Sequence, residues 1–335
     1  MRIWFNRGFS LAPIAKAMMA ADTDLEVVTS VDKNRPVHAG AYDTWVEPTV
    51  DDEAYVAWVR NQIIENEIDL FIPTRHRKLL AGIALPCAVH LPADIATLEL
   101  LDDKFAFADA IAGEPFHLET INIASSADLA AALAAFAALP DETSLCIKPR
   151  SGVNGHGFWR LTRESPLSHI INPDARTMQQ DLFLAALRFE EAERPLAPFV
   201  LMEYLPGPEV SFDVLCHHGI ILKYVARTKE AAYQRLQTYH PLEEQARKLV
   251  GRFGLHGVIN AQFRKARDGS WRVLEINARP AGGSIYGEEF GTGLLADWGG
   301  LLSGRLTPDT ISRPDLDCKI ETISCITQMS EHQTR

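Results

Sequence analysis

The segment that most constrains the fold of this chain is residues 269–284, which read GSWRVLEINARPAGGS. Its apolar and β-branched residues predict a buried strand over residues 272–276. Because side chains alternate along a strand, Glu275 and Asn277 project on the same side, and Arg279 joins them if the chain stays extended. A carboxylate, an amide and a guanidinium in one line can hold Mg²⁺ and polyphosphate, since Mg²⁺ takes oxygen ligands and borrows some of them from its substrate.

A second apolar run, residues 257–263, precedes this strand and carries Gln262 thirteen residues before Glu275. If the two runs pair as a hairpin, Gln262 supplies another oxygen to the same ion. The alternative is an ordinary hairpin whose polar residues face water, and the short motif alone leaves both interpretations open.

The composition is that of a folded chain with a sizeable core. The 335 residues suit two domains, or one domain with a large insertion, and 47% of them are hydrophobic. The net charge of −11 gives no electrostatic footprint for nucleic acid, and no apolar run is long enough to span a membrane. We therefore expect neither nucleic acid nor a membrane as a partner.

Two further features favour a cytoplasmic location. The N-terminus begins with strand-like residues 2–5 and lacks the apolar core of a signal peptide. The five cysteines are odd in number and include no Cys-x-x-Cys pair, so we expect buried thiols in a reducing compartment.

The first hundred residues alternate between strand and helix patterns, which predicts a small doubly wound parallel α/β domain. The expected strands are residues 3–5, 25–30, 69–73 and 86–91, and the expected helices are residues 11–21 and 51–67. The turn after the first strand, residues 6–10, holds a single glycine, so the Gly-x-Gly-x-x-Gly fingerprint of dinucleotide sites is absent. We interpret the unit as a substrate or framework domain and set an NAD-dependent oxidoreductase aside.

Ligands of open α/β sheets gather beyond the carboxyl ends of the strands. Arg75 follows the strand predicted for residues 69–73, so it is placed to hold the far end of a substrate. The alternative is a solvent-exposed basic patch over residues 75–78 at the start of a helix.

A domain boundary is expected near residues 92–101, followed by an amphipathic helix over residues 102–111 with Asp102 as its N-cap. Lys104 lies in the first turn of this helix, where the helix dipole disfavours a cation. A phosphate bound at the same helix end would explain the position, and an ordinary surface lysine is the alternative.

A glycine-rich loop follows the strand predicted for residues 145–149. Glycine lets backbone N–H groups approach a polyphosphate closely, and a loop that joins two strands can close over phosphates as a flap. The loop does not end in Gly-Lys-Ser/Thr, so it is not a Walker A loop. Lys148, inside the strand, is placed to contact the α- and β-phosphates. The candidate loop contacts are Ser151, Gly152, Gly155 and Gly157.

The strand predicted for residues 198–205 ends before a Pro-Gly-Pro turn and Glu209. A purine edge can be read by backbone groups where a strand stops pairing, which suits the backbone of Glu203, Tyr204 and Leu205. Glu209 can accept hydrogen bonds from ribose hydroxyls, as acidic residues do in nucleotide sites. The alternative is a hairpin turn that carries a solvated glutamate.

One face of the strand predicted for residues 219–227 carries Lys223 and Arg227. Two cations beside the proposed metal motif suggest contacts with an anion. Ordinary charge pairing within the protein is the alternative.

Taken in order, these motifs resemble those of the ATP-grasp ligases over about residues 1–305. The resemblance rests on Lys104 at a helix start, Lys148-Pro with its glycine loop, Met202-Glu-Tyr-Leu-Pro-Gly-Pro-Glu209, Gln262, and Glu275-x-Asn277-x-Arg279. The metal motif, Gln262 followed by Glu275-x-Asn277-x-Arg279, is most similar to that of carbamoyl-phosphate-synthetase-like members. D-alanine ligases usually carry Asp, and not Gln, at the first metal position.

The resemblance implies a chain of mixed α/β and α+β class. A doubly wound parallel α/β domain, residues 1–96, would precede an ATP-grasp domain, residues 97–310. The latter would consist of two α+β subdomains, a small lid over about residues 115–200 and a C-terminal subdomain over about residues 201–310. Residues 311–335 would form a C-terminal segment.

The resemblance also implies a role for each motif. For ATP, the implied ligands are Lys104, Lys148 and the glycine loop for the phosphates, Glu203, Tyr204 and Leu205 for adenine, and Glu209 for ribose. For one or two Mg²⁺ ions, which Mn²⁺ can replace, they are Gln262, Glu275 and Asn277. For catalysis, it is Arg279 at the γ-phosphate and acyl phosphate. From the residues themselves we add Lys148 and Arg227 as further catalytic cations, the backbone of Gly283 and Ser284 as contacts of the substrate carboxylate, and Arg75 for its far end.

The activity implied is that of an ATP-dependent ligase. It would join a small, amino-acid-like carboxylate to an amine through an acyl phosphate and release ADP and phosphate. The alternatives are a carbamoyl-phosphate-synthetase-like or carboxylating enzyme, and an ATP–Mg-binding protein without ligase activity. The partners expected are therefore small molecules, and a homodimer through the N-terminal domain is the working expectation for oligomeric state.

Overall fold

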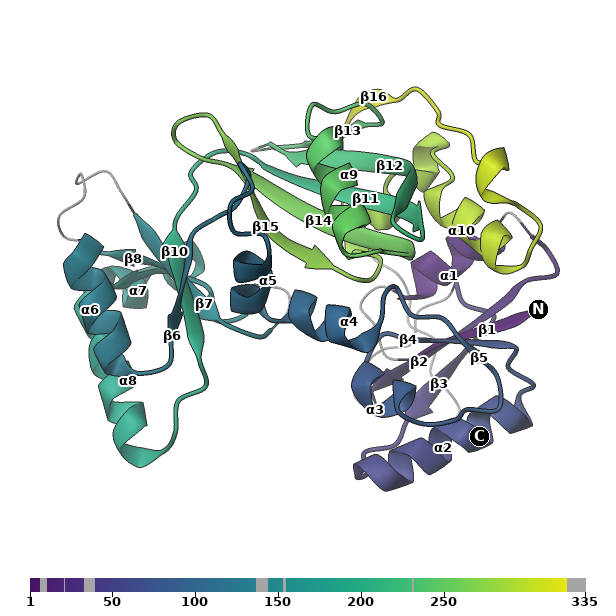
Figure 1. Ribbon diagram of the computed structural model, residues 1–335, viewed down its shortest axis with the longest axis horizontal. Coiled ribbons are helices and arrows are strands. Elements are labelled where there is room, and N and C mark those ends of the chain that lie inside the picture. Colours follow the sequence, from purple (N-terminus) through teal and green to yellow (C-terminus); the bar gives the residue numbers. More distant parts are fainter. Residues whose placement is uncertain are drawn as a thin grey trace.

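The structure, a computed structural model, describes residues 1–6, 11–20, 22–32, 40–136, 144–152, 155–230 and 232–323. Three β-sheets form its frame, with helices packed between and beside them (Figure 1). An N-terminal parallel α/β unit is followed by a mixed sheet and an antiparallel sheet, each with its own helices. This order confirms the fold class expected from the sequence.

The N-terminal sheet has the strand order β3-β2-β1-β4-β5, and all its pairings are parallel. Its strands are β1 (Arg2–Asn6), β2 (Glu26–Asp32), β3 (Asp43–Glu47), β4 (Leu70–Pro73) and β5 (Ala88–Val89), and its helices are α1 (Leu11–Met19), α2 (Asp52–Glu65) and α3 (Arg77–Ala81). Because side chains alternate along β1, Trp4 packs into the core under α2, whereas Phe5 packs into the core that contains α1.

The N-terminal unit contains one strand that the sequence did not predict, and some of its predicted residues lie outside the described ranges. The edge strand β3 is an addition to the sequence prediction, since Glu47 is its only fully buried residue and it lacks an apolar pattern. Residues 7–10 of the single-glycine turn and residue 21 of the predicted first helix lie outside the described residues.

The second sheet has the order β6-β10-β7-β8-β9 and is antiparallel except for the β8–β9 pair. Its strands are β6 (Thr120–Ile123), β7 (Leu145–Pro149), β8 (Trp159–Thr162), β9 (Thr177–Gln179) and β10 (Phe199–Glu203), and its helices are α6 (Ser126–Phe136), α7 (Leu167–Ile171) and α8 (Gln180–Glu193). Helices α6 and α8 cover one face through a core that includes Leu129, Leu187 and Leu201. The opposite face carries Cys146 and Met202 toward the third sheet.

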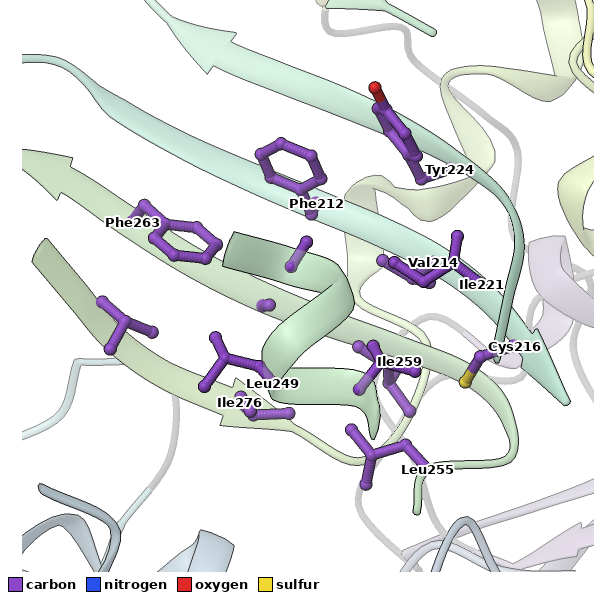
Figure 2. Close-up of a cluster of buried hydrophobic side chains, with 14 of the residues drawn as sticks. Phe212, Val214, Cys216, Ile221, Tyr224, Leu249, Leu255, Ile259, Phe263 and Ile276 are labelled. Carbon is purple, nitrogen blue, oxygen red and sulfur yellow. The ribbon is translucent and has the colours of Figure 1, made fainter. Parts of the chain in front are cut away.

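The third sheet is antiparallel and has the order β15-β14-β11-β12-β13-β16. Its strands are β11 (Glu209–His217), β12 (Ile220–Lys229), β13 (Gln234–Gln237), β14 (Gly257–Lys265), β15 (Trp271–Asn277) and β16 (Asp317–Ile320). Helix α9 (Glu243–Arg252) lies across one face, and Figure 2 shows Leu249 from this helix among Ile259, Phe263 and Ile276 from the strands. Asp213, Asn260 and Gln262 alternate with the apolar residues of this core along β11 and β14 and therefore lie on the other face.

Helices also join the sheets to one another. Helix α10 (Leu294–Leu302) packs with α1 between the first and third sheets, in a core that contains Phe5, Val258 and Trp298. The remaining short elements are the 3₁₀ helices η1 (Pro173–Ala175), η2 (Gly282–Ile285), η3 (Glu288–Phe290) and η4 (Pro308–Thr310).

The segment between the first two sheets corrects the predicted helix at residues 102–111. The expected boundary contains helix α4 (Ile95–Asp102), whose N-cap is Asp94. Helix α5 (Lys104–Ala110) then begins at Lys104, and its N-cap is Asp103 rather than Asp102. The carboxylate of Asp103 accepts hydrogen bonds from two backbone N–H groups of the first turn, so Asp102 remains the last residue of α4.

The structure bears on two expectations, the absence of a membrane-spanning segment and the burial of the cysteine thiols. Within the described ranges, no helix is both long and apolar enough to cross a membrane. The four described cysteines are free thiols; Cys146 and Cys216 are buried, whereas Cys87 and Cys318 are half-buried. Cys325 lies outside the described residues, as do residues 324–335 as a whole.

Candidate functional site

A cleft between the second and third sheets gathers most of the residues singled out in the sequence. One part of its wall is apolar and is formed by Cys146, Phe158, Met202, Leu205 and Leu274. The other part is polar and is formed by Lys104, Lys148, Gly152, Gly155, His156, Arg176, Glu209, Gln262, Arg264 and Glu275. An apolar slot that continues into a charged end suits a ligand with a flat base at one end and anionic groups at the other.

The charged end contains two lysines from different elements. Lys104 comes from the first turn of α5 and Lys148 from β7, and the Nζ of Lys104 donates a hydrogen bond to the carbonyl oxygen of Gly152, 2.9 Å away. Burial lowers the pKa of Lys104, Glu275 opposes this shift, and Lys148 adds to it. The two cations therefore repel each other across the cleft, and a bound anion would relieve the repulsion.

An ion pair fixes the position of Lys104 relative to the glycine loop. The Nε of Arg150 donates to both carboxylate oxygens of Asp103, at 2.7 and 2.8 Å, and the backbone N–H of Lys104 donates to the Arg150 carbonyl at 3.0 Å. Burial alone would raise the pKa of Asp103, but the hydrogen bond from Arg150 and those from the helix backbone lower it. The start of α5 and the start of the loop thus behave as one unit.

The glycine loop needs its glycines for backbone reasons. Gly155 and Gly157 have φ angles of 64° and 70°, in the left-handed region that other residues rarely adopt. A Cβ at Gly157 would also lie 2.7 Å from the Cγ of Pro149. The guanidinium of Arg176 donates to the Gly155 carbonyl at 2.6 Å and holds the far side of the loop. Residues 153 and 154 lie outside the described residues.

The segment after β10 connects two sheets and is not a hairpin. Strand β10 pairs with β6 and β7, whereas β11 pairs with β12 and β14, which excludes the hairpin alternative. Regular pairing ends at Glu203, and Leu205 follows in the wall of the cleft. Glu209 lines the cleft and pairs with Lys229 at 2.5 Å and with Arg264 at 3.9 Å.

The polar residues of β14 and β15 lie on one face of the third sheet. Gln262 and Glu275 are directly opposite each other, so the hairpin predicted from the sequence is confirmed. The Nδ2 of Asn277 donates to the Oε1 of Glu275 at 3.0 Å, and the Nε2 of Gln262 donates to the Oδ1 of Asn260 at 3.3 Å. A carboxylate flanked by two amides is an oxygen-rich donor set, which suits Mg²⁺ or Mn²⁺.

A buried network supports this face from β11 and β12. Asp213, 1% exposed, accepts hydrogen bonds from Arg227 at 2.5 Å, Ser284 at 2.6 Å and Asn260 at 2.9 Å. Burial would lower the pKa of Arg227, but the charge and hydrogen bond of Asp213 raise it. A Cβ on Gly283 would lie 2.4 Å from the Nη1 of Arg227, so this glycine permits the guanidinium to pack against η2.

A second pair of guanidinium groups lies at the end of β15. Burial lowers the pKa of Arg279; Glu275 raises it, and Arg77 from α3 lowers it again. Arg77 donates to the Oδ2 of Asp102 at 2.6 Å and to the Ala278 carbonyl at 3.4 Å, so it spans from the N-terminal unit to β15. Arg75 is exposed. Two neighbouring cations beside Glu275 form a candidate anion site.

The structure thus brings together one group of the predicted residues and separates another. Those that line the cleft are Lys104, Lys148, Gly152, Gly155, Glu203, Tyr204, Leu205, Glu209, Gln262 and Glu275. The others, although all are described, do not line it: Ser151, Gly157, Asn277, Arg279, Arg227, Arg75, Gly283 and Ser284. Among the latter, Asn277 reaches the cleft through its hydrogen bond to Glu275, and Gly157 through the loop.

Comparisons with known proteins agree with this geometry. A family model described as an ATP-grasp in the biosynthetic pathway with Ter operon matches residues 195–296. The fold is similar to an L-amino acid ligase from Bacillus licheniformis, with a TM-score of 0.62, 16% identity, and coverage of 93% of this chain and 77% of that one. The chain has the ATP-grasp fold, and its residues 195–296 match an ATP-grasp family model.

Two other solved structures share the ATP-grasp fold. One is N5-carboxyaminoimidazole synthetase from Staphylococcus aureus complexed with ADP, with a TM-score of 0.59, 17% identity, and coverage of 89% and 77% of the two chains. The other is a biotin carboxylase–βγ-ATP complex from Campylobacter jejuni, with a TM-score of 0.63, 13% identity, and coverage of 93% and 73%. No curated protein sequence matches the chain.

Sequence reasoning missed several residues of this candidate site. Asp103 and Arg150 hold Lys104 and the glycine loop in place, Asp213 holds Arg227, and Arg77 lies beside Arg279. Arg77 was within reach of sequence reasoning, because it lies two residues beyond Arg75 in the same basic stretch. The sequence could not single out Asp213, because it does not show whether a carboxylate within an apolar strand is buried with partners or exposed to water.

Proposed function

We propose that this chain is an ATP-dependent ligase that joins a small, amino-acid-like carboxylate to an amine through an acyl phosphate. The observation that carries the proposal is the pairing of Gln262 with Glu275 in a cleft that also contains Lys104 and Lys148. Oxygen ligands and phosphate-binding cations face one space beside an apolar slot. This set matches the demands of phosphoryl transfer, in which positioning and electrostatics supply nearly all of the catalysis.

The proposed reaction has two steps. A carboxylate oxygen attacks the γ-phosphorus of ATP, the bond to the β,γ-bridging oxygen breaks, and ADP leaves. The amine then attacks the acyl carbon, phosphate leaves with the carbon–oxygen bond electrons, and the amine loses a proton to give the amide. The apolar slot would take adenine, with Glu203, Tyr204 and Leu205 at its edge, and Glu209 would accept from ribose hydroxyls.

The metal site is assigned to Glu275, Gln262 and Asn277. Carboxylate and amide oxygens fit Mg²⁺ or Mn²⁺, and one or two such ions would neutralise charge on the ATP phosphates. The protein offers a single carboxylate among these ligands, so a second ion should bind more weakly than the first. Lys104 and Lys148 would contact the phosphates from the opposite side of the cleft, and the glycine loop would close over them and exclude water.

The substrate carboxylate is assigned to Arg279 beyond β15 and to the nearby cations of the N-terminal unit. Arg279 is placed next to Glu275 and would stabilise charge that develops on the acyl phosphate and on the tetrahedral intermediate. Arg77 is the neighbouring cation and Arg75 the exposed one, so both are candidates for the far end of the substrate. Arg227, held by Asp213 against Gly283 and Ser284, is the second catalytic candidate.

The proposal also includes domain boundaries at residues 96 and 310 and a subdomain division near residue 200. It further includes a homodimer through the N-terminal domain. Light scattering of the purified chain measures the oligomeric state. Limited proteolysis with mass spectrometry would locate the boundaries, because cleavage concentrates in exposed connections between folded units.

The decisive experiment is a screen for ADP release with amino acids, other small acids and bicarbonate, each tested with and without amines. We expect release that requires both an acid and an amine. Release that requires bicarbonate would favour the carboxylating alternative instead. Binding of ATP–Mg²⁺ without stimulated release by any acid would favour a nucleotide-binding protein without ligase activity.

The mechanism is tested separately by positional isotope exchange in the β,γ-bridge of ATP, with the acid present and the amine absent. Exchange is expected because acyl-phosphate formation is reversible while ADP stays bound and its β-phosphate can rotate. Glu275→Gln should abolish the exchange. The matched control is Glu65→Gln, since Glu65 is exposed at the end of α2. No exchange with any active acid would contradict the acyl-phosphate route.

A further inference from the structure

Three histidines meet at the end of the third sheet, outside the ATP cleft. His217 is the last residue of β11, His218 begins the turn to β12, and His256 precedes β14. One ring nitrogen from each lies within 4.8 Å of those from the other two. His217 lies eight residue steps along β11 from Glu209 in the ATP cleft, or about 26 Å at about 3.3 Å per step. The cluster is therefore independent of the nucleotide site.

The rings are arranged face to face and edge to face. His218 and His256 are stacked, with ring centroids 4.2 Å apart and planes 5° from parallel. His217 stands edge-on to both, at 4.5 Å from His218 and 5.0 Å from His256. His256 also packs against the buried ring of His90 at 5.0 Å. Three imidazoles from two chain segments are thus already grouped around one point.

The backbone holds the two segments together. His218 has a φ of 46°, in the left-handed region that few non-glycine residues adopt, and Gly219 follows at 84°. The Gly219 N–H donates to the Leu255 carbonyl at 2.8 Å, and the His218 N–H donates to the Nδ1 of His256 at 3.4 Å. The turn is therefore anchored to the segment that carries His256, and the cluster does not depend on chance contact between mobile loops.

The cluster offers three imidazole rings, each with a nitrogen donor atom close to those of the other two. A neutral imidazole offers a nitrogen lone pair, and it is the commonest metal ligand in proteins. Within the described part of the chain, this is the one cluster of His, Cys, Asp or Glu side chains whose donor atoms converge in this way.

We propose that His217, His218 and His256 bind one divalent transition-metal ion, with Zn²⁺ as the preferred occupant. Imidazole ligands suit Zn²⁺, Cu²⁺, Ni²⁺ and Co²⁺ and do not suit Mg²⁺, which prefers oxygen. With metal–nitrogen bonds of about 2.0–2.1 Å, tetrahedral ligands lie about 3.3 Å apart. The donor atoms, which lie within 4.8 Å of one another, would have to approach by at most roughly 1.5 Å through rotation of the side chains.

A bound ion would link the β11–β12 turn to the start of β14. It would stabilise the folded chain in proportion to its binding, because the separated segments of an unfolded chain do not offer a preformed site. Three protein ligands leave a further coordination position open to water. The site is therefore inferred as a structural or regulatory clamp on the sheet that carries the ATP-site residues at its other end.

The test is calorimetric titration of the untagged full-length chain with Zn²⁺ in excess Mg²⁺, which occupies oxygen-rich sites. We expect one Zn²⁺ per chain with micromolar or tighter affinity, together with a rise in Tm. His218→Asn preserves a residue type that tolerates the left-handed turn and should weaken binding at least about tenfold, as should His256→Gln. The control is His76→Asn, because His76 is also exposed and has a φ of 54°.

Co²⁺ provides a second readout that does not depend on affinity alone. Wild-type protein loaded with Co²⁺ should give the intense visible absorption of a four-coordinate nitrogen-rich site, and both cluster variants should lose it while His76→Asn keeps it. Unchanged Zn²⁺ affinity and an unchanged Co²⁺ spectrum in folded cluster variants would overturn the proposal. Absence of Zn²⁺ binding to the wild-type chain would overturn it equally, and neither result would bear on the ligase reaction.

Discussion

Gln262 and Glu275 face each other directly across the antiparallel pair β14–β15, although Glu275 lies thirteen positions further along the sequence. Their register places one amide and one carboxylate side by side on the sheet face that borders the cleft. A β-bulge follows immediately between Gln262 and Phe263. Bulges bend a strand and re-aim its side chains, so the irregularity lies where the orientation of Gln262 would matter most.

This pairing predicts opposite effects for two isosteric substitutions. Glu275→Gln removes the only carboxylate of the proposed metal site, so ATP turnover should fall by at least about 100-fold. Gln262→Glu adds a second carboxylate and should lower the Mg²⁺ concentration that gives half-maximal turnover. Mg²⁺ titrations of ADP release measure both, with Glu65→Gln as the control. Wild-type turnover by Glu275→Gln would remove the metal assignment.

Arg77, the first residue of α3, and Arg75, which precedes that helix, are predicted to contribute differently to the KM for the carboxylate. Arg77 lies beside Arg279 and is anchored by Asp102, whereas Arg75 is exposed. Arg77→Ala should therefore raise the KM for the carboxylate by roughly 10-fold or more, and by more than Arg75→Ala does. Arg77→Lys keeps the charge and should recover part of the loss. A larger effect for Arg75→Ala would restore Arg75 as the carboxylate contact.

Asp213 is predicted to be a stability residue that acts through Arg227. Asp213→Asn leaves a buried guanidinium without its carboxylate, and breaking such a pair costs about 3–5 kcal/mol. The free energy of unfolding from denaturant titration measures this loss. Asp213→Asn combined with Arg227→Met should recover part of it, because both charges are then removed. The exposed Asp309→Asn is the control, and an equally small loss at both positions would contradict the network.

Buried histidines predict a loss of stability in mild acid. Burial, with help from His256 and His218, lowers the pKa of His90 to about 3, and the unfolded value is near 6.5. Below pH 6.5 the unfolded chain binds a proton that the folded chain does not, so stability falls as pH decreases from about 6.5 toward 3. The slope approaches about 1.4 kcal/mol per pH unit for one such group.

Unfolding measured at several pH values in a metal-chelating buffer tests this dependence. His256, with a pKa near 4, adds a similar contribution over the range from about 6.5 to 4. His90→Phe should flatten the profile in that window relative to wild type. An identical slope in His90→Phe would show that other groups control the acid response.

The sequence alone determined the parts of the site that depend on local pattern. Strand alternation was enough to put Glu275 and Asn277 on one face, and the apolar runs that flank a short turn were enough to pair Gln262 with Glu275. Lys148 and the glycine loop were recognisable because they are consecutive in the chain. The same local logic found the parallel N-terminal unit, whose buried strands are short, continuous apolar runs.

Tertiary structure decided which residues meet across elements. Asp102 and Asp103 are equivalent as capping residues in the sequence, and only the ion pair with Arg150 and the start of α5 distinguishes them. Arg75 was predicted because it closely follows the strand at residues 70–73, whereas only the packing of α3 against Asp102 and the end of β15 places Arg77 beside Arg279. Asp213 and the three histidines of the β11–β12 end have meaning only through partners that lie far away along the chain. The physical reason is that hydrophobic periodicity fixes each element and its buried face, whereas contacts between polar groups depend on how those elements pack together.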